Sequence, residues 1–226
     1  MLIRKLQFNI DYFHILTFRE QYKEIISPYF SFENLSYEIE NENTIHERIR
    51  LVFNNEKIAL FIRKEGISIV FEGDVTELKD QNGVMKPFWD IFERIKDFQG
   101  YSKSHRHSIV VHSVELLEQE KYEEILKTPP YLVLNPFKNL TDFACVYESK
   151  SQESEYRFHF GAYSNVDLNR HDLSPFKTKH NSDLKDGTGL LIRCEIKKAE
   201  KNPGFGKFKS LLNEAEKICT EYKLST

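Results

Sequence analysis

The sequence has few cysteines and no long apolar run. These two features argue against a disulfide-rich protein and against a membrane-spanning or secreted one. Its three cysteines, Cys145, Cys194 and Cys219, are far apart and without Cys-x-x-Cys spacing. This pattern argues against a disulfide-rich scaffold and predicts reduced, buried thiols in a cytoplasmic protein. Nowhere do about 18 apolar residues follow one another, so neither a membrane-spanning helix nor a secretory signal is expected.

An excess of charge of one sign is also missing. The 226 residues include 32 Lys and Arg against 35 Asp and Glu, which gives a net charge of -3. The chain as a whole therefore has no positive field that would attract nucleic acid or an anionic membrane, although a local basic patch is compatible with this balance. Aromatic residues, in contrast, are plentiful, with 18 Phe and 11 Tyr. They favour broad sheet faces covered by helices over a helical bundle.

The clearest periodic stretch covers residues 45–71, where apolar and polar side chains alternate in three short runs. The runs are residues 48–53, 58–63 and 67–71. Two asparagines follow the first run, and asparagine tolerates the left-handed backbone of a tight turn. Gly66 precedes the third run and offers positive φ without steric cost. The stretch therefore predicts an antiparallel β-meander with one buried face.

Similar periodicities predict the other elements. Strands are expected over residues 2–12, 35–39, 105–116, 142–148, 155–163 and 189–196, and helices over 18–28, 88–98, 118–126 and 205–222. The order strand, helix, several antiparallel strands, helix occurs twice. The sequence thus predicts an α+β fold of two similar halves, residues 1–100 and 101–226, in which amphipathic helices cover antiparallel β-meanders. The two halves could also form one continuous domain.

A known family shares this element order and an aromatic helix. The second helix of the first half contains the cluster Phe88-Trp89-Asp90-Ile91-Phe92. With this cluster, the chain resembles an uncharacterised, sporadically distributed bacterial family whose members consist of two strand-helix-meander-helix halves. The resemblance covers most of the chain and implies no established activity. It implies a small cytosolic bacterial protein, of a kind that works beside a partner in antiviral defence or toxin–antitoxin systems.

One pattern in the second half is compatible with enzymatic chemistry. Asp183 and Asp186 precede Glu195-Ile196-Lys197, and alternation places Glu195 and Lys197 on the same strand face. An Asp followed by Glu-x-Lys resembles the metal site of restriction-endonuclease-like nucleases, in which carboxylates hold Mg²⁺ and the lysine helps to activate water. Glu-x-Lys is also frequent on exposed strands, so the alternative is a solvated sheet edge.

Two histidines form a second candidate site. His105 and His107 share one face of an expected strand, at the spacing that a metal site on a strand would use. No third ligand is evident in the sequence. The alternative is a polar strand start, next to Lys103 and Arg106, that faces an anion. We therefore predict neither a bound metal nor a cofactor.

A nucleic-acid interface is a further alternative for the second half. Tyr156, Phe158 and Phe160 share a strand with Arg157, and aromatic rings among cations can stack on unpaired bases. The lysines that could surround such a sheet are Lys177, Lys179, Lys185, Lys197 and Lys198. Acidic residues are interleaved throughout, which weakens a phosphate-binding surface.

These patterns favour a non-enzymatic cytosolic interaction protein, with a metal-dependent nuclease or a nucleic-acid-binding protein as the alternative. Residues 67–71 carry no charge that would discourage strand pairing, so the other half, a second copy or a different protein is expected to cover them. We expect a homodimer or a stable protein partner that buries more than about 1,000 Å² of surface. No contact with a membrane is expected.

Overall fold

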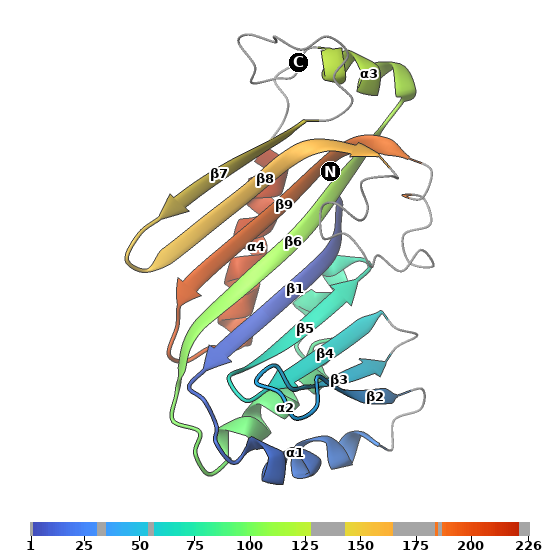
Figure 1. Cartoon of the computed structure of the whole chain (residues 1–226). Helices are drawn as coiled ribbons and strands as arrows, with labels where there is room; N and C mark the ends of the chain where they lie inside the picture. Colours follow the sequence, from blue (N-terminus) through green and yellow to red (C-terminus); the bar gives the residue numbers. More distant parts are fainter. Residues whose placement is uncertain are drawn as a thin grey trace.

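Nine antiparallel strands form one sheet in the computed structural model, which describes residues 2–30, 35–53, 57–127, 143–164, 184 and 187–221 (Figure 1). The strands are β1 (Leu2–Tyr12), β2 (Ser36–Glu40), β3 (Arg48–Phe53), β4 (Ile58–Arg63), β5 (Gly66–Glu72), β6 (Ser104–Leu117), β7 (Ala144–Lys150), β8 (Ser154–Ser164) and β9 (Thr188–Ala199). The helices are α1 (Phe18–Ile26), α2 (Lys86–Lys96), α3 (Gln119–Lys127) and α4 (Phe205–Glu221). The protein is therefore a mixed α and β protein with an antiparallel sheet.

Strands β1 and β6 lie side by side in the middle of the sheet, whose order is β2-β3-β4-β5-β1-β6-β9-β8-β7. The first five strands in this order come from residues 1–100, and the last four come from residues 101–226. In each range the first strand pairs with the last strand, β1 with β5 and β6 with β9. The antiparallel β1–β6 pair joins the two ranges into one continuous sheet.

Alternation along the strands gives the sheet an apolar face. In β1, Leu6, Phe8 and Ile10 are fully buried, whereas the residues between them are polar. The antiparallel register keeps apolar residues of neighbouring strands together, since Phe8 lies opposite Ile69 of β5 and Ile109 of β6. The hydrophobic core is built on this face.

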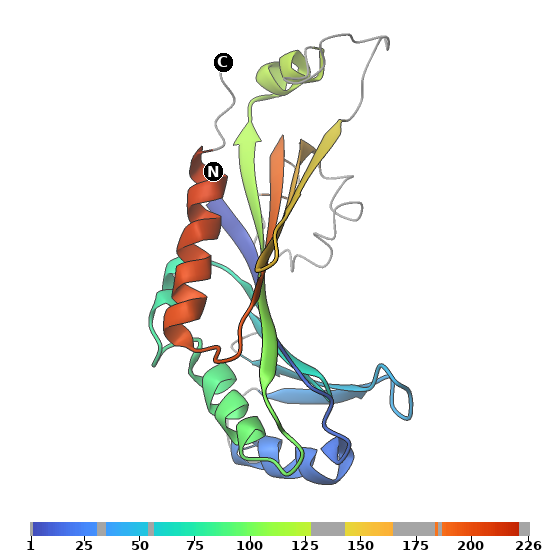
Figure 2. The same cartoon turned by 90° about the vertical axis from the view of Figure 1, so that its left-hand side faces the viewer.

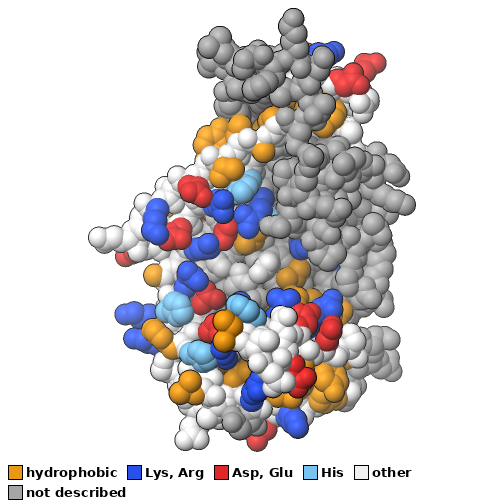
Figure 3. Space-filling model, viewed as in Figure 1, with side chains coloured by type: hydrophobic (Ala, Val, Ile, Leu, Met, Phe, Trp, Pro, Cys, Tyr) orange, Lys and Arg blue, Asp and Glu red, His pale blue; other side chains and the backbone are white. Residues whose placement is uncertain are grey.

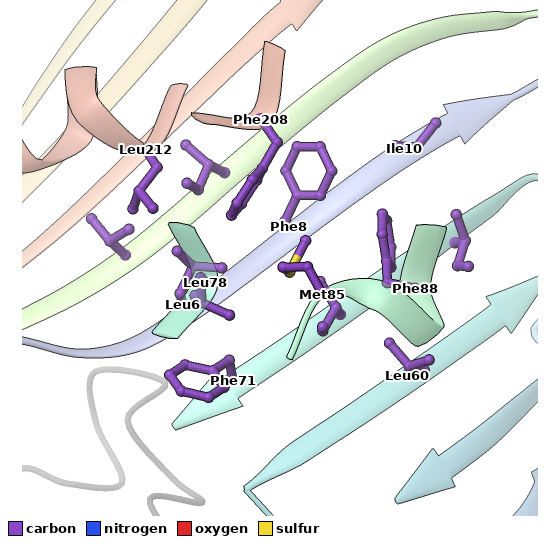
Figure 4. Packing of buried hydrophobic residues seen from close by; sticks show 14 of the residues in the cluster. Leu6, Phe8, Ile10, Leu60, Phe71, Leu78, Met85, Phe88, Phe208 and Leu212 are labelled. Atoms are coloured by element: carbon purple, nitrogen blue, oxygen red, sulfur yellow. The ribbon is translucent and has the colours of Figure 1, made fainter. Parts of the chain in front are cut away.

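Helices α2 and α4 lie on the apolar face, and Figure 2 shows both on the same side of the sheet. Pro87 stands in the first turn of α2, where the missing N–H of proline leaves no hydrogen bond unmade. The fully buried residues of α2 are Phe88, Ile91, Phe92 and Ile95. From α4, Phe208 and Leu212 are fully buried, and α4 packs mainly on β9 and β6. Figure 4 shows the Phe208 ring beside Phe8 of β1. No helix in the described ranges combines the length and the apolar character needed to cross a membrane.

The expected strands and helices are present, and their ends differ from the expected ones by a few residues. The expectation that the other half or another chain covers residues 67–71 is wrong. These residues belong to β5, which is internal and pairs with β4 on one side and β1 on the other. Alternation identifies a strand and its buried face, but it does not specify the neighbours of that strand.

Candidate functional site

The sheet face opposite to α2 and α4 carries polar and charged side chains, and we call it the polar face. It consists of Lys5, Gln7, Asn9 and Asp11 of β1 and the residues paired with them across the sheet. Figure 3 views this face and shows basic, acidic and histidine side chains gathered on it. Cross-strand pairing arranges these side chains in rows. Asn9, for example, lies opposite Ser68 and Ser108 and donates a hydrogen bond of 2.9 Å to Ser108.

A hollow of about 260 Å³ opens on the polar face over β1, β3, β4 and β5, and we call it the basic hollow. Five cationic side chains line it, Lys5, Arg48, Arg50, Lys57 and Arg63. Phe61 and Glu72 also line it. The guanidinium of Arg48 lies 4.7 Å from the centre of the Phe61 ring, a distance typical of a cation–π contact. The lining of the hollow thus combines an aromatic ring with five cations and one carboxylate, Glu72.

Carboxylates in and around the basic hollow hold its cations in position. The ion pairs are Arg63–Asp11 at 3.8 Å, Arg50–Glu38 at 3.4 Å, Arg50–Glu40 at 3.8 Å, Lys57–Glu77 at 2.6 Å, Lys5–Glu72 at 3.9 Å and Arg48–Glu40. The Nε atom of Arg63 is buried and has no hydrogen-bond partner among the described residues. A guanidinium has five N–H donors, so these pairs leave much of the donor capacity of the arginines unused.

Glu195 and Lys197 lie together on β9, as the sequence predicts. Lys197 Nζ lies 2.8 Å from Glu195 Oε1, and Arg193 Nη2 lies 3.3 Å from Glu195 Oε2. Burial alone would raise the pKa of Glu195, but the hydrogen bond from Lys197 and the charge of Arg193 outweigh it and lower the pKa. Glu195 is therefore an ionised carboxylate held between two cations. Asp183 and Asp186 lie outside the described residues.

We expect the Glu195→Gln variant to lose roughly 1 to 3 kcal/mol of unfolding free energy at pH 7, because two cations lose a charged partner in a site where the Glu195 side chain is 12% exposed. The loss should shrink as the pH falls below about 4, because the lowered pKa of Glu195 stabilises the fold only while its carboxylate is ionised. Urea denaturation at several pH values measures this difference.

The matched control for this experiment is Glu93→Gln on α2, away from the sheet edges. Glu93 also pairs with a lysine, Lys96, but its side chain is 62% exposed. We expect this change to cost less than about 1 kcal/mol. Equal losses in the two variants would contradict the buried ion-pair role of Glu195. Mg²⁺-dependent DNA cleavage by the wild type that Glu195→Gln abolishes would instead support the nuclease hypothesis.

His105 and His107 both belong to β6 but lie in different environments. His107 is 3% exposed and its ring centre is 6.2 Å from that of Phe8, whereas His105 is exposed and its ring centre is 5.1 Å from that of Phe13. Burial lowers the pKa of His107, although the nearby Glu200 acts in the opposite direction. Within the described ranges, no three His, Cys, Asp or Glu side chains are grouped so that they could hold a metal ion.

Tyr156, Phe158 and Phe160 of β8 lie on the side of the strand that faces α4 and not on the polar face. Phe160 is buried in the core, and Tyr156 donates a hydrogen bond of 2.7 Å to Glu214 of α4. Lys198 also binds Glu214, at 2.6 Å. Arg157 lies on the opposite face of the strand from Tyr156. These contacts contradict the expected base-stacking surface on β8. Lys177, Lys179 and Lys185 lie outside the described residues.

The cysteines are free thiols, as expected. Cys194 and Cys219 are buried, and Cys145 is half-buried. Burial raises the pKa of the Cys194 thiol to about 12 and also raises the pKa of Cys219. Both thiols therefore stay protonated at neutral pH, which makes them poor nucleophiles.

The outermost strands of the described sheet are β2 and β7. On β2, Glu38 and Glu40 form ion pairs with arginines of β3, and such charges discourage pairing with another chain. The run from Ala144 to Tyr147 on β7 carries no charge, and Val146 is 50% exposed. In Figure 1, β7 forms the outer margin of the sheet, with no described strand beyond it.

Sequence reasoning missed the basic hollow. Its arginines occupy polar positions of the meander, where Arg48 and Arg50 alternate with the buried Ile49 and Leu51. Three arginines on the polar side of one meander are a signal that can be found in the sequence. Their proximity to Lys5 follows from the β1–β5 pairing, which the sequence alone does not specify.

No protein-family profile matches the chain, and no curated protein resembles it in sequence.

Proposed function

We propose that the protein is a non-enzymatic interaction protein of the bacterial cytoplasm that assembles through the β7 edge of its sheet. The main observation in support is the uncharged, exposed segment around Val146 on an outermost strand. An edge strand offers backbone N–H and C=O groups, and apolar side chains on it favour pairing with another strand. The setting in defence or toxin–antitoxin systems is supported by the family resemblance of the sequence.

We also infer that the chain consists of two similar halves, each an antiparallel meander covered by helices. Outward from β1, the first half continues with β5, β4, β3 and β2, and outward from β6 the second half continues with β9, β8 and β7. In this comparison β7 corresponds to β3, whose outer edge is covered by β2. In the described part of the second half, β7 is the outermost strand. Residues 128–142, which correspond to β2 in chain order, lie outside the described residues.

We propose that a second copy of the chain pairs with the outer edge of β7. Antiparallel pairing of two β7 strands about a two-fold axis at Tyr147 would use the whole strand. Val146 would then lie opposite Glu148 of the second copy, and Ala144 opposite Lys150, so that no like charges meet across the pair. The two sheets would become one, and we expect the dimer to bury more than about 1,000 Å².

The homodimer can be tested by size-exclusion chromatography with light scattering at low micromolar concentration. We expect the wild type to show the mass of two chains. The Val146→Lys variant should show the mass of one chain, because a lysine on an edge strand discourages strand pairing. Thermal unfolding should show that this variant is still folded, since Val146 is half exposed.

The matched control is Tyr37→Lys on β2, the opposite edge. Tyr37 is 55% exposed and its strand is also outermost, so a lysine there should leave the dimer intact. A wild-type mass of one chain would contradict the homodimer. A dimer that persists in Val146→Lys, or that dissociates equally in both variants, would contradict the assignment to β7.

A further inference from the structure

The basic hollow lies on the polar face of the first half, away from the β7 edge. We propose that it binds a small organic phosphate, a phosphate monoester carried on a planar ring such as that of a nucleoside monophosphate. This site is separate from the proposed dimer contact, and the two proposals can fail independently.

The arginines of the hollow provide the donors for the phosphate. Arg48 and Arg50 come from β3, and Arg63 comes from the end of β4, where it lies opposite Arg48. Three guanidinium groups present planar pairs of N–H donors, a geometry that matches two phosphate oxygens at a time. Lysine ammonium groups at the same hollow add positive charge. This combination selects a dianion over a neutral ligand.

The carboxylates near the hollow do not cancel this preference. Arg50 Nη1 lies 3.4 Å from Glu38 and Arg50 Nε lies 3.8 Å from Glu40, and the Arg50 side chain is 31% exposed, so its Nη2 donors are accessible. The Nε atom of Arg63 is buried without a hydrogen-bond partner among the described residues, and its Nη2 atom approaches Asp11 Oδ1 only at 3.8 Å. A buried donor without an acceptor is unfavourable, and a bound anion next to the guanidinium would reduce this cost.

The floor of the hollow provides the surface for a ring. Phe61 lies between the cationic residues, and Ala59 and Val70 add apolar surface beside it. Ala59 and Val70 are directly opposite each other on β4 and β5. The Arg48 guanidinium lies 4.7 Å from the centre of the Phe61 ring, so a planar ring would pack on this floor beside Arg48, with its attached phosphate among the arginines. The volume of about 260 Å³ is slightly below that of pockets for drug-sized ligands, which suits one ring with one phosphate.

The second half provides an internal comparison. Arg157 and Glu148 form a cross-strand arginine–glutamate pair on the same sheet face, at 2.9 Å. Arg157 does not line the basic hollow. Arg50 and Arg157 are therefore two paired, partly exposed arginines that differ in whether they belong to the proposed site.

Isothermal titration calorimetry of the full chain with adenosine monophosphate, inorganic phosphate and adenosine tests the proposal. We expect adenosine monophosphate to bind more tightly than either of its parts. Arg50→Gln should weaken its binding by about tenfold or more, because a hydrogen bond between charged groups contributes a factor of that size. Arg157→Gln should leave the affinity unchanged.

A second variant keeps the test decisive if Arg50→Gln does not fold. Arg63→Lys retains the charge but removes the planar pair of donors, and it should also weaken binding of adenosine monophosphate. Replacing Phe61 with leucine should reduce the advantage of adenosine monophosphate over inorganic phosphate, because the ring loses its aromatic neighbour.

Three outcomes would overturn the proposal. The first is the absence of binding of adenosine monophosphate at millimolar concentration. The second is an equal loss of affinity in Arg50→Gln and Arg157→Gln, which would indicate general attraction to a charged surface. The third is binding of single-stranded oligonucleotides of up to ten nucleotides, with an affinity that rises with their length and falls steeply with salt. This result would indicate a nucleic-acid surface.

Discussion

Replacing Phe8 with alanine is expected to lower the free energy of unfolding by about 3 to 5 kcal/mol. Phe8 is fully buried in β1, in the middle of the sheet. Its ring centre lies 4.9 Å from that of Phe208, 5.5 Å from that of Phe88 and 5.9 Å from that of Trp89. Alanine would therefore leave a cavity between β1, α2 and α4 that these large rings cannot close without moving.

Urea denaturation followed by tryptophan fluorescence measures this effect, because the only tryptophan of the chain is Trp89, next to the Phe8 ring. Phe13→Ala is the matched control. Phe13 belongs to the same segment but is 49% exposed, so its replacement should cost less than about 1 kcal/mol. A similar cost for both variants would contradict the view that Phe8 is at the centre of the core.

The strands were predictable because their buried and exposed positions alternate. In β3 and β4 the buried Ile49, Leu51, Leu60 and Ile62 alternate with less buried residues, and this period of two is visible in the sequence. The positions of the helices were predictable for a similar reason, because their apolar residues recur at three- and four-residue steps. Local periodicity indicates which side of a strand or helix is buried, whichever elements pack beside it.

The order of the strands was not predictable from the same patterns. The run of residues 67–71 is apolar and uncharged because β5 is internal, and the sequence alone does not distinguish this reason from an edge that binds another chain. The pairing of β1 with β6 joins residues about one hundred positions apart, and several apolar strands would satisfy the same pattern. Strand order depends on long-range packing that one sequence does not specify.

For the candidate sites too, relations within one strand were predictable and contacts between strands were not. Glu195 and Lys197 were correctly placed on one face because their relation depends only on alternation within β9. The basic hollow was missed because it requires side chains from β1, β3 and β4 to meet. A binding surface at Tyr156 and Phe160 is an alternative that the sequence leaves open, because alternation does not specify which face a helix covers, and α4 lies on theirs.

Replacing Leu212 with alanine in α4 is expected to cost about 2 to 5 kcal/mol of unfolding free energy. The sequence predicts this helix as an integral part of the fold from the spacing of Phe205, Phe208, Leu212, Ala215, Cys219 and Tyr222. Phe208, Leu212 and Ala215 are fully buried. Tyr222 lies outside the described residues.

Two polar contacts just C-terminal to Leu212 restrict how far α4 can move to fill the resulting cavity. Glu214 binds Lys198 of β9 at 2.6 Å, and Glu216 binds Lys79 at 2.7 Å. Leu116→Ala on β6 is the matched control, because Leu116 is 38% exposed and its truncation should cost less than about 1 kcal/mol. Chemical denaturation of both variants measures the difference. An unchanged stability of Leu212→Ala would show that α4 is an appended helix and would contradict its place in the core.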